Sequence, residues 1–136
     1  MVDEEFFTVS TRAGPELVVV TAVGEVDTQT ATLLRSVLWN AIERAPARLV
    51  VLDASGVVFM SSGGLAVLVT AAELAEQGRK RFLVVTGDQR VIPRALHVAG
   101  LDRIVSTSPS YPDGIAADTH PASSPPGDGR RDAPAA

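Results

Sequence analysis

The chain has 136 residues, no cysteine and a net charge of −4, which excludes disulfides, thiolate catalysis and cysteine-based zinc sites. The negative charge argues against nucleic acid or an anionic membrane surface as the main partner. An apolar fraction of 46% with only 4% aromatic residues predicts a globular α/β protein whose core is built from Val, Leu, Ile and Ala.

The beginning of the chain carries no targeting pattern. Residues 1–5 are acidic and lack the basic and then apolar order of a signal peptide. No apolar run approaches the roughly 20 residues that a membrane-spanning helix needs. We therefore expect a soluble, cytoplasmic protein that has no membrane partner.

The first strands are predicted to form a hairpin. Residues 6–11 alternate between apolar and polar side chains, residues 12–15 contain the turn formers Gly and Pro, and residues 17–23 are almost continuously apolar. This order is typical of an antiparallel pair that leads into a buried central strand.

A helix is expected next, with Asp27 or Thr28 as its cap and Pro46 as its stop. Its apolar residues recur at helical spacing. Residues 49–52 then form a short strand that is apolar throughout, as expected where both faces of a sheet are covered. This helix and strand follow the buried strand at residues 17–23, so the strand 49–52 is expected to run parallel to it.

The second half of the chain repeats the alternation. A helix is expected over about residues 63–77, a strand over 82–86, a third helix over about 92–99 and a last short strand that includes 104–105. The sequence therefore predicts an α/β domain over residues 1–107, with a mixed, mostly parallel sheet of four to five strands packed with helices.

The composition changes after residue 107. Residues 108–136 are rich in Pro, Ser, Gly and Ala, with Tyr111 and Ile115 as the only bulky apolar side chains. Such a segment buries too little apolar surface to offset the entropy of ordering. We therefore expect a disordered tail.

Two serines and two glycines at positions 61–64 lie between the strand that ends near Asp53 and the second predicted helix. A Ser hydroxyl at this junction can cap the helix, whose first N–H groups have no partner within it, and can also accept a phosphoryl group. The carboxyl ends of parallel strands meet at one edge, so Asp27 is expected close to Ser62. A helix cap and a magnesium or phosphate ligand are both open roles for Asp27.

Enzymatic motifs are missing. The two histidines are His97, on the third predicted helix, and His120, in the tail. The sequence around Ser62 lacks the Gly-x-Ser-x-Gly order of a nucleophile elbow. The chain also lacks the two glycine motifs that bind nucleotide phosphates, Gly-x4-Gly-Lys-Ser/Thr and Gly-x-Gly-x-x-Gly after the first long strand. We therefore expect no catalytic residue, no metal site and no cofactor. A weak nucleotide hydrolase is the enzymatic alternative, and the sequence offers no residues of the required kind.

Several segments together resemble one family. Residues 24–27 (Gly-Glu-Val-Asp) resemble its Gly-Glu-Leu-Asp, residues 52–60 are similar to the strand and turn before its Asp-Ser-Ser-Gly-Leu signature, and residues 96–101 resemble its closing helix and turn. From roughly residue 5 to residue 107 the chain resembles a STAS domain of the anti-sigma-factor-antagonist type.

The resemblance implies a switch that is not an enzyme. The unphosphorylated antagonist binds an anti-sigma factor that is also a serine kinase and so releases the sigma factor, and phosphorylation reverses this binding. The family's acceptor serine corresponds to Ser62. Ser61 stands where the family has Asp, which makes Ser61 a second candidate acceptor, and Gly63 replaces the second Ser of the signature. The alternative is a STAS module that is never phosphorylated and docks in another signalling or lipid-transport complex.

The expected partner-binding surface follows from this correspondence, and no direct contact with nucleic acid is expected. Its centre comprises Met60, Ser61, Ser62, Gly63 and Gly64, with Glu25, Asp27 and Thr28 beside it.

Overall fold

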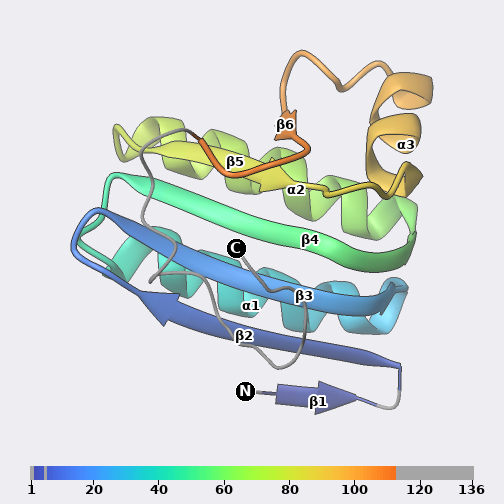
Figure 1. Cartoon of the computed structure of the whole chain (residues 1–136), viewed down its shortest axis with the longest axis horizontal. Helices are drawn as coiled ribbons and strands as arrows, with labels where there is room; N and C mark the ends of the chain where they lie inside the picture. The colour runs from blue at the N-terminus through green and yellow to red at the C-terminus, as the bar shows by residue number, and fades with distance from the viewer. Residues whose placement is uncertain (1, 5, 113–136) are drawn as a thin grey trace.

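Three strands come first in the chain, and from the third strand on, strands and helices alternate, as Figure 1 shows. The computed structural model describes residues 2–4 and 6–112. The elements, in chain order, are β1 (Val2–Glu4), β2 (Phe7–Ala13), β3 (Leu17–Val26), α1 (Thr28–Arg44), β4 (Leu49–Met60), α2 (Ser62–Gln77), β5 (Arg81–Val85), α3 (Val91–Ala99) and β6 (Ser106–Ser108).

The strands form one mixed sheet in the order β1-β2-β3-β4-β5-β6. The pairs β1–β2 and β2–β3 are antiparallel, and the pairs β3–β4, β4–β5 and β5–β6 are parallel. The predicted α/β fold with a mostly parallel sheet is confirmed. The sequence predicted four to five strands, and the sheet has six, with a short strand of three residues at each edge.

The helices pack on one face of the sheet. Every second residue of β3, such as Val18 and Val20, belongs to the main core together with Leu34 and Leu38 of α1 and Leu68 of α2. The residues between them point to the opposite face, where a second and smaller cluster lies. This helix-free face is turned toward the viewer in Figure 1. The smaller cluster on this face consists of Leu17, Val19, Leu49, Val51, Leu83 and Val85.

Strand β4 is longer than the predicted segment 49–52 and bulges twice against β3. Between the pairs Thr21↔Asp53 and Glu25↔Phe59, the register shifts in two places, and β4 carries the extra residue each time. A bulge twists a strand and redirects its side chains. Phe59 is 48% exposed and its neighbour Val58 is 64% exposed, just before the junction with α2.

Helix α3 covers β4 beyond the point where β5 ends. Strand β5 pairs with β4 only as far as Asp53. One side chain then joins the strand to the helix: Gln89 Nε2 donates to the carbonyl of Ala54 at 2.9 Å, and Gln89 Oε1 accepts from the Ile92 backbone N–H at 3.0 Å. The carbonyl of Ala54, directly after the part of β4 that pairs with β5, is thereby satisfied by an amide.

The segment after α3 differs from the prediction. Residues 104–105 do not form a strand: Ile104 and Val105 lie in the turn after α3, and the strand follows at Ser106–Ser108. The expected boundary at residue 107 falls inside β6, and the described chain continues to Pro112. The prediction of a disordered tail otherwise concerns residues 113–136, including Ile115, which lie outside the described residues. Within the described ranges, no helix is long and apolar enough to span a membrane.

Candidate functional site

Two strand-to-helix junctions lie side by side at one edge of the sheet. Val26, the last residue of β3, pairs with Met60, the last residue of β4. The backbone N–H of Ser61 donates to the carbonyl of Val26 at 2.8 Å, which ties the second junction to the first. Asp27 caps α1 and Ser61 caps α2, so two helices begin next to each other.

The junction at Asp27 is closed by a capping box. Asp27 Oδ1 accepts from the backbone N–H of Thr30 at 2.8 Å, and the Asp27 N–H donates to Thr30 Oγ1 at 2.8 Å. The hydrogen bonds that Thr30 donates to the exposed Asp27 carboxyl, first from its backbone N–H and next from its hydroxyl, hold the pKa of Asp27 below its usual value. Of the roles left open for Asp27, the structure shows the helix cap.

The junction at Ser61 divides its two hydroxyls between different environments. Ser61 Oγ is half-buried and accepts from the backbone N–H of Gly64 at 3.1 Å. Ser62 is exposed as the first residue of α2, and within residues 6–112 its hydroxyl makes no hydrogen bond. Ser61 therefore serves the helix, while Ser62 faces solvent at the positive end of the helix dipole.

Met60 and Gly64 lie inside the junction and not at the contact centre where the sequence placed them. Met60 is 8% exposed and Gly64 is buried. A Cβ on Gly64 would lie 2.2 Å from Met60 Sδ and 2.8 Å from Val26 Cγ1. Glycine is therefore required for this close approach of α2 to the ends of both strands.

The remaining predicted residues lie at the surface of the two junctions. Glu25, Asp27 and Thr28 are exposed, and Gly63 is half-buried. A Cβ on Gly63 would meet only Ser61 Oγ at 3.6 Å and Ala31 Cβ at 4.0 Å. The first turns of α1 and α2 are thus close together. The structure brings Glu25, Asp27 and Thr28 to the same edge as Ser62, as expected.

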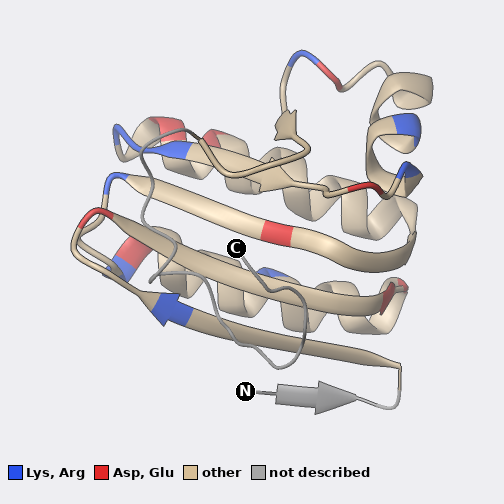
Figure 2. Ribbon diagram, viewed as in Figure 1, with Lys and Arg blue, Asp and Glu red and all other residues tan. Residues whose placement is uncertain are grey.

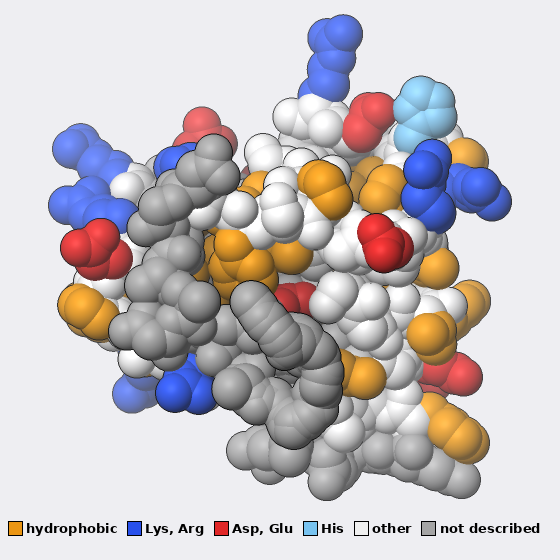
Figure 3. Space-filling model, in the orientation of Figure 1, with side chains coloured by type: hydrophobic (Ala, Val, Ile, Leu, Met, Phe, Trp, Pro, Cys, Tyr) orange, Lys and Arg blue, Asp and Glu red, His pale blue; other side chains and the backbone are white. Residues whose placement is uncertain are grey.

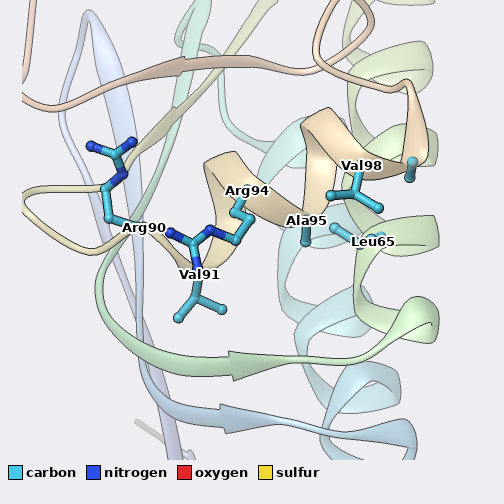
Figure 4. A pocket seen from close by; sticks show the side chains of 7 residues that line it. Leu65, Arg90, Val91, Arg94, Ala95 and Val98 are labelled. Atoms are coloured by element: carbon cyan, nitrogen blue, oxygen red, sulfur yellow. The ribbon is translucent and has the colours of Figure 1, made fainter.

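A groove next to this edge was not predicted. It lies between α2 and α3, has a volume of about 590 Å³, and ends in two arginines, Arg90 and Arg94, as Figure 4 shows. Among the described residues neither arginine forms an ion pair. Val98 is 80% exposed in the apolar part of the groove. The signal in the sequence was the apolar Val98 outside the buried stripe of α3. The lining residues are Leu65, Arg90, Val91, Arg94, Ala95, Val98 and Ala99.

No metal centre is formed by the residues that the structure describes. None of their His, Asp and Glu side chains gather in a group of three or more that could hold a metal ion. The Nδ1 atom of exposed His97, near the end of α3, lies 3.0 Å from Asp102 Oδ2. The hydrogen bond from His97 and, to a smaller extent, the charges of His97 and Arg103 keep the pKa of Asp102 below its usual value.

Solved structures share this fold. An anti-sigma factor antagonist from Mycobacterium paratuberculosis is 26% identical, with a TM-score of 0.66, and the match covers 81% of this chain and 92% of that one. SpoIIAA in its unphosphorylated form is 18% identical, with a TM-score of 0.61 over 75% of this chain and 87% of its own. The phosphorylated form of this Bacillus cell fate determinant gives a TM-score of 0.57 at 18% identity, over 75% and 90% of the two chains.

At the level of sequence, no curated protein matches the chain. A family model does match, and it covers residues 8–114 under the description STAS domain. The match includes β3, both helix caps, the Ser61-to-Gly64 junction and the whole of α3. The chain belongs to the STAS domain family.

Proposed function

We propose that this protein is an anti-sigma-factor antagonist that binds an anti-sigma factor through the surface around Ser62, and that phosphorylation of Ser62 ends the binding. The observation that carries the proposal is the position of Ser62, exposed at the first residue of α2 with its hydroxyl unengaged among the described residues. The antagonist from Mycobacterium paratuberculosis, 26% identical over most of both chains, supports the role.

The contact surface follows from the exposure of its residues. Its residues are exposed or half-buried: Ser62, Ser61 and Gly63 form the centre, and Glu25, Asp27 and Thr28 lie on the neighbouring junction. Met60 and Gly64 act from inside by fixing the start of α2. The groove between α2 and α3 begins at Leu65, one helical turn after Ser62, and extends this surface toward Arg90 and Arg94.

Ser62 is favoured over Ser61 as the acceptor by the capping geometry. Ser61 Oγ accepts from the Gly64 N–H, so a kinase that used Ser61 would have to take away the cap of α2. Replacing such a cap costs about 1 kcal/mol. A phosphoryl group on Ser62 would leave the cap in place and add nearly two negative charges at the end of the helix that favours anions.

The charge of the phosphate supplies the switch. At the centre of a docked surface the phosphate must lose water or face carboxylates of the partner, and an unpaired buried charge costs several kcal/mol. A loss of about 4 kcal/mol corresponds to roughly a thousandfold weaker binding. The partner on this proposal is an anti-sigma factor that is also a serine kinase, and the setting is the bacterial cytoplasm.

The proposal is tested by titration calorimetry against the anti-sigma factors with kinase domains encoded in the same genome. We expect one of them to bind the wild-type protein, and Ser62→Glu to weaken that binding at least a hundredfold. Thr70→Glu, an exposed position two turns along α2, adds the same charge as a control and should bind like wild type. Equal binding of Ser62→Glu and wild type would overturn the proposal.

Phosphopeptide mapping of the protein from its own cells separates the two serines. Phosphate on Ser62 supports the switch. Its absence from both Ser61 and Ser62 across growth and stress conditions would favour the alternative, a docking module that is not phosphorylated. Ser61, the cap of α2, stands where the family has Asp beside the acceptor, and this difference is the observation that favours the alternative.

A further inference from the structure

The apolar cluster on the helix-free face of the sheet needs a cover. Its six aliphatic side chains come from the three central strands and are between 0% and 9% exposed, yet none of the helices packs on them. The described residue that packs against this cluster is Tyr111, close to the end of the described chain. In Figure 3, which shows this face, basic side chains lie around the rim and hydrophobic side chains lie between them.

Tyr111 also makes a hydrogen bond with a residue far away in the sequence. Its hydroxyl donates to Asp53 Oδ2 at 2.7 Å. Asp53 is only 5% exposed and is the acidic residue in the middle of β4 in Figure 2. Its other oxygen, Oδ1, accepts from the hydroxyl of Ser55 at 2.7 Å and from the Ser55 N–H at 3.1 Å. A buried carboxylate requires such donors.

The path of the chain explains how Tyr111 reaches β4. Asp53, Val85 and Ser108 form one row across β4, β5 and β6. After Ser108 the chain is tied to the end of β5, because the N–H of Thr86 donates to the Ser108 carbonyl at 2.9 Å and the N–H of Gly87 donates to the Pro109 carbonyl at 3.1 Å. The Ser108 hydroxyl donates to the Ser110 carbonyl at 2.7 Å and closes a turn. The chain thereby folds back along the row and places Tyr111 over Asp53.

We propose that residues 109–112 are a strap that binds the helix-free face of this protein's own sheet, and that the hydrogen bond between Tyr111 and Asp53 is the latch that holds it. The ring of Tyr111 covers the aliphatic cluster, and its hydroxyl satisfies the buried carboxylate. Opening the latch exposes an apolar surface on the face that α1 and α2 leave uncovered. This surface is separate from the one around Ser62, so the inference does not depend on the proposed function.

The test uses the fact that Tyr111 is the only tyrosine in the chain. Burial, and then the charge of Asp53, raise the pKa of Tyr111 far above the usual value of about 10. In the full-length wild-type protein we expect no phenolate absorbance as the pH passes about 10, while the far-ultraviolet circular dichroism stays native. Phenolate formation near pH 10 in the folded protein, as for a free tyrosine, would overturn the proposal.

Variants of the full chain test the latch itself. Tyr111→Phe keeps the ring but leaves Asp53 without this donor, so the ratio of folded to unfolded protein should fall roughly tenfold to a hundredfold in urea unfolding. Ser110→Ala, at the exposed neighbouring position, should behave like wild type. In a double-mutant cycle with Asp53→Asn the two changes should be clearly less than additive. Additive effects, or a Tyr111→Phe variant as stable as Ser110→Ala, would contradict the latch.

Removal of the ring tests the cover. Tyr111→Ala should bind the dye anilinonaphthalene sulfonate, which reports exposed apolar surface, while Ser110→Ala should not. A natively folded Tyr111→Ala variant that binds no more dye than wild type would show that Tyr111 does not cover the cluster. The phenolate titration needs no variant, and so it decides the question even if Tyr111→Ala fails to fold.

Discussion

The two neighbouring junctions are built from the same parts but are closed with different strength. At the first, Asp27 and Thr30 exchange hydrogen bonds in a capping box, and Thr30 Oγ1 also donates to the Glu25 carbonyl at 2.8 Å. At the second, Ser61 accepts one hydrogen bond from Gly64, and Ser62 is followed by two glycines. The first junction thus works as a fixed support, and the second presents a hydroxyl and open backbone.

The glycines of the two junctions should give the largest difference. Gly24 has a φ of 111°, and a Cβ there would lie 2.0 Å from the backbone oxygen of Phe6. Backbone cannot move aside as a side chain can, so Gly24→Ala should lower the free energy of unfolding by about 3 kcal/mol. At Gly64 the nearest atom belongs to the flexible Met60 side chain, and Gly64→Ala should cost about 1 to 2 kcal/mol.

Gly63→Ala is the matched control for both changes. A Cβ at this position has no contact closer than 3.6 Å, and alanine favours the helix by up to about 1 kcal/mol. Urea unfolding should therefore show Gly63→Ala to be as stable as wild type or more stable. If Gly64→Ala matched Gly63→Ala, the close packing of α2 on the strand ends would not be what requires the second glycine.

Loss of the cap at Asp27 should lower the stability more than loss of the cap at Ser61. Ser61→Ala removes one hydrogen bond at the start of α2 and should cost about 1 kcal/mol. Asp27→Ala removes the acceptor of a reciprocal box and should lower the melting temperature further. Calorimetric melting of the two variants measures the difference. Equal losses would mean that the Asp27 carboxylate stabilises its helix no more than the single hydrogen bond from Gly64 to Ser61 does.

The smallest effect is expected from acid. Hydrogen bonds from Thr30 lower the pKa of Asp27 in the folded protein, so its contribution to stability is present above the unfolded pKa of about 3.9 and is lost as the pH falls through the lower folded value. Asp27→Asn keeps a capping oxygen but does not titrate. Below about pH 4 the stability of wild type should therefore fall toward that of Asp27→Asn. A difference that stays constant across this range would contradict the prediction.

Local pattern predicted the parts of the fold that depend on near neighbours. The hairpin of β2 and β3, the helices and the cap at Asp27 follow from periodicity and capping chemistry, and the structure confirms them. The length of β4 did not follow, because Ser55 and Gly56 resemble a turn, and only the pairing with β3 keeps the strand going through two bulges. Strand β6 has no apolar residue, and its parallel pairing with β5 defines it.

The site was predicted to a similar degree. The motif located the junction and gave Ser62 as the first and Ser61 as the second candidate acceptor, but the burial of Met60 and Gly64 depends on how α2 approaches two strand ends. Tyr111 was assigned to the tail on composition. Its partner Asp53 lies 58 positions away, a separation that local composition cannot detect.

The amide of Gln89 has a consequence for how this domain can vary. It attaches the start of α3 to the edge of β4, where β5 no longer supplies a strand, and the buried side chains of Ile92 and Leu96 pack the helix into the main core. Because α3 is held by this amide and by side-chain packing, a change in its tilt would break no hydrogen bond of the sheet. The width of the groove between α2 and α3 is therefore adjustable separately from the sheet, so one scaffold can be fitted to partners of different shape by substitutions around residues 89–99.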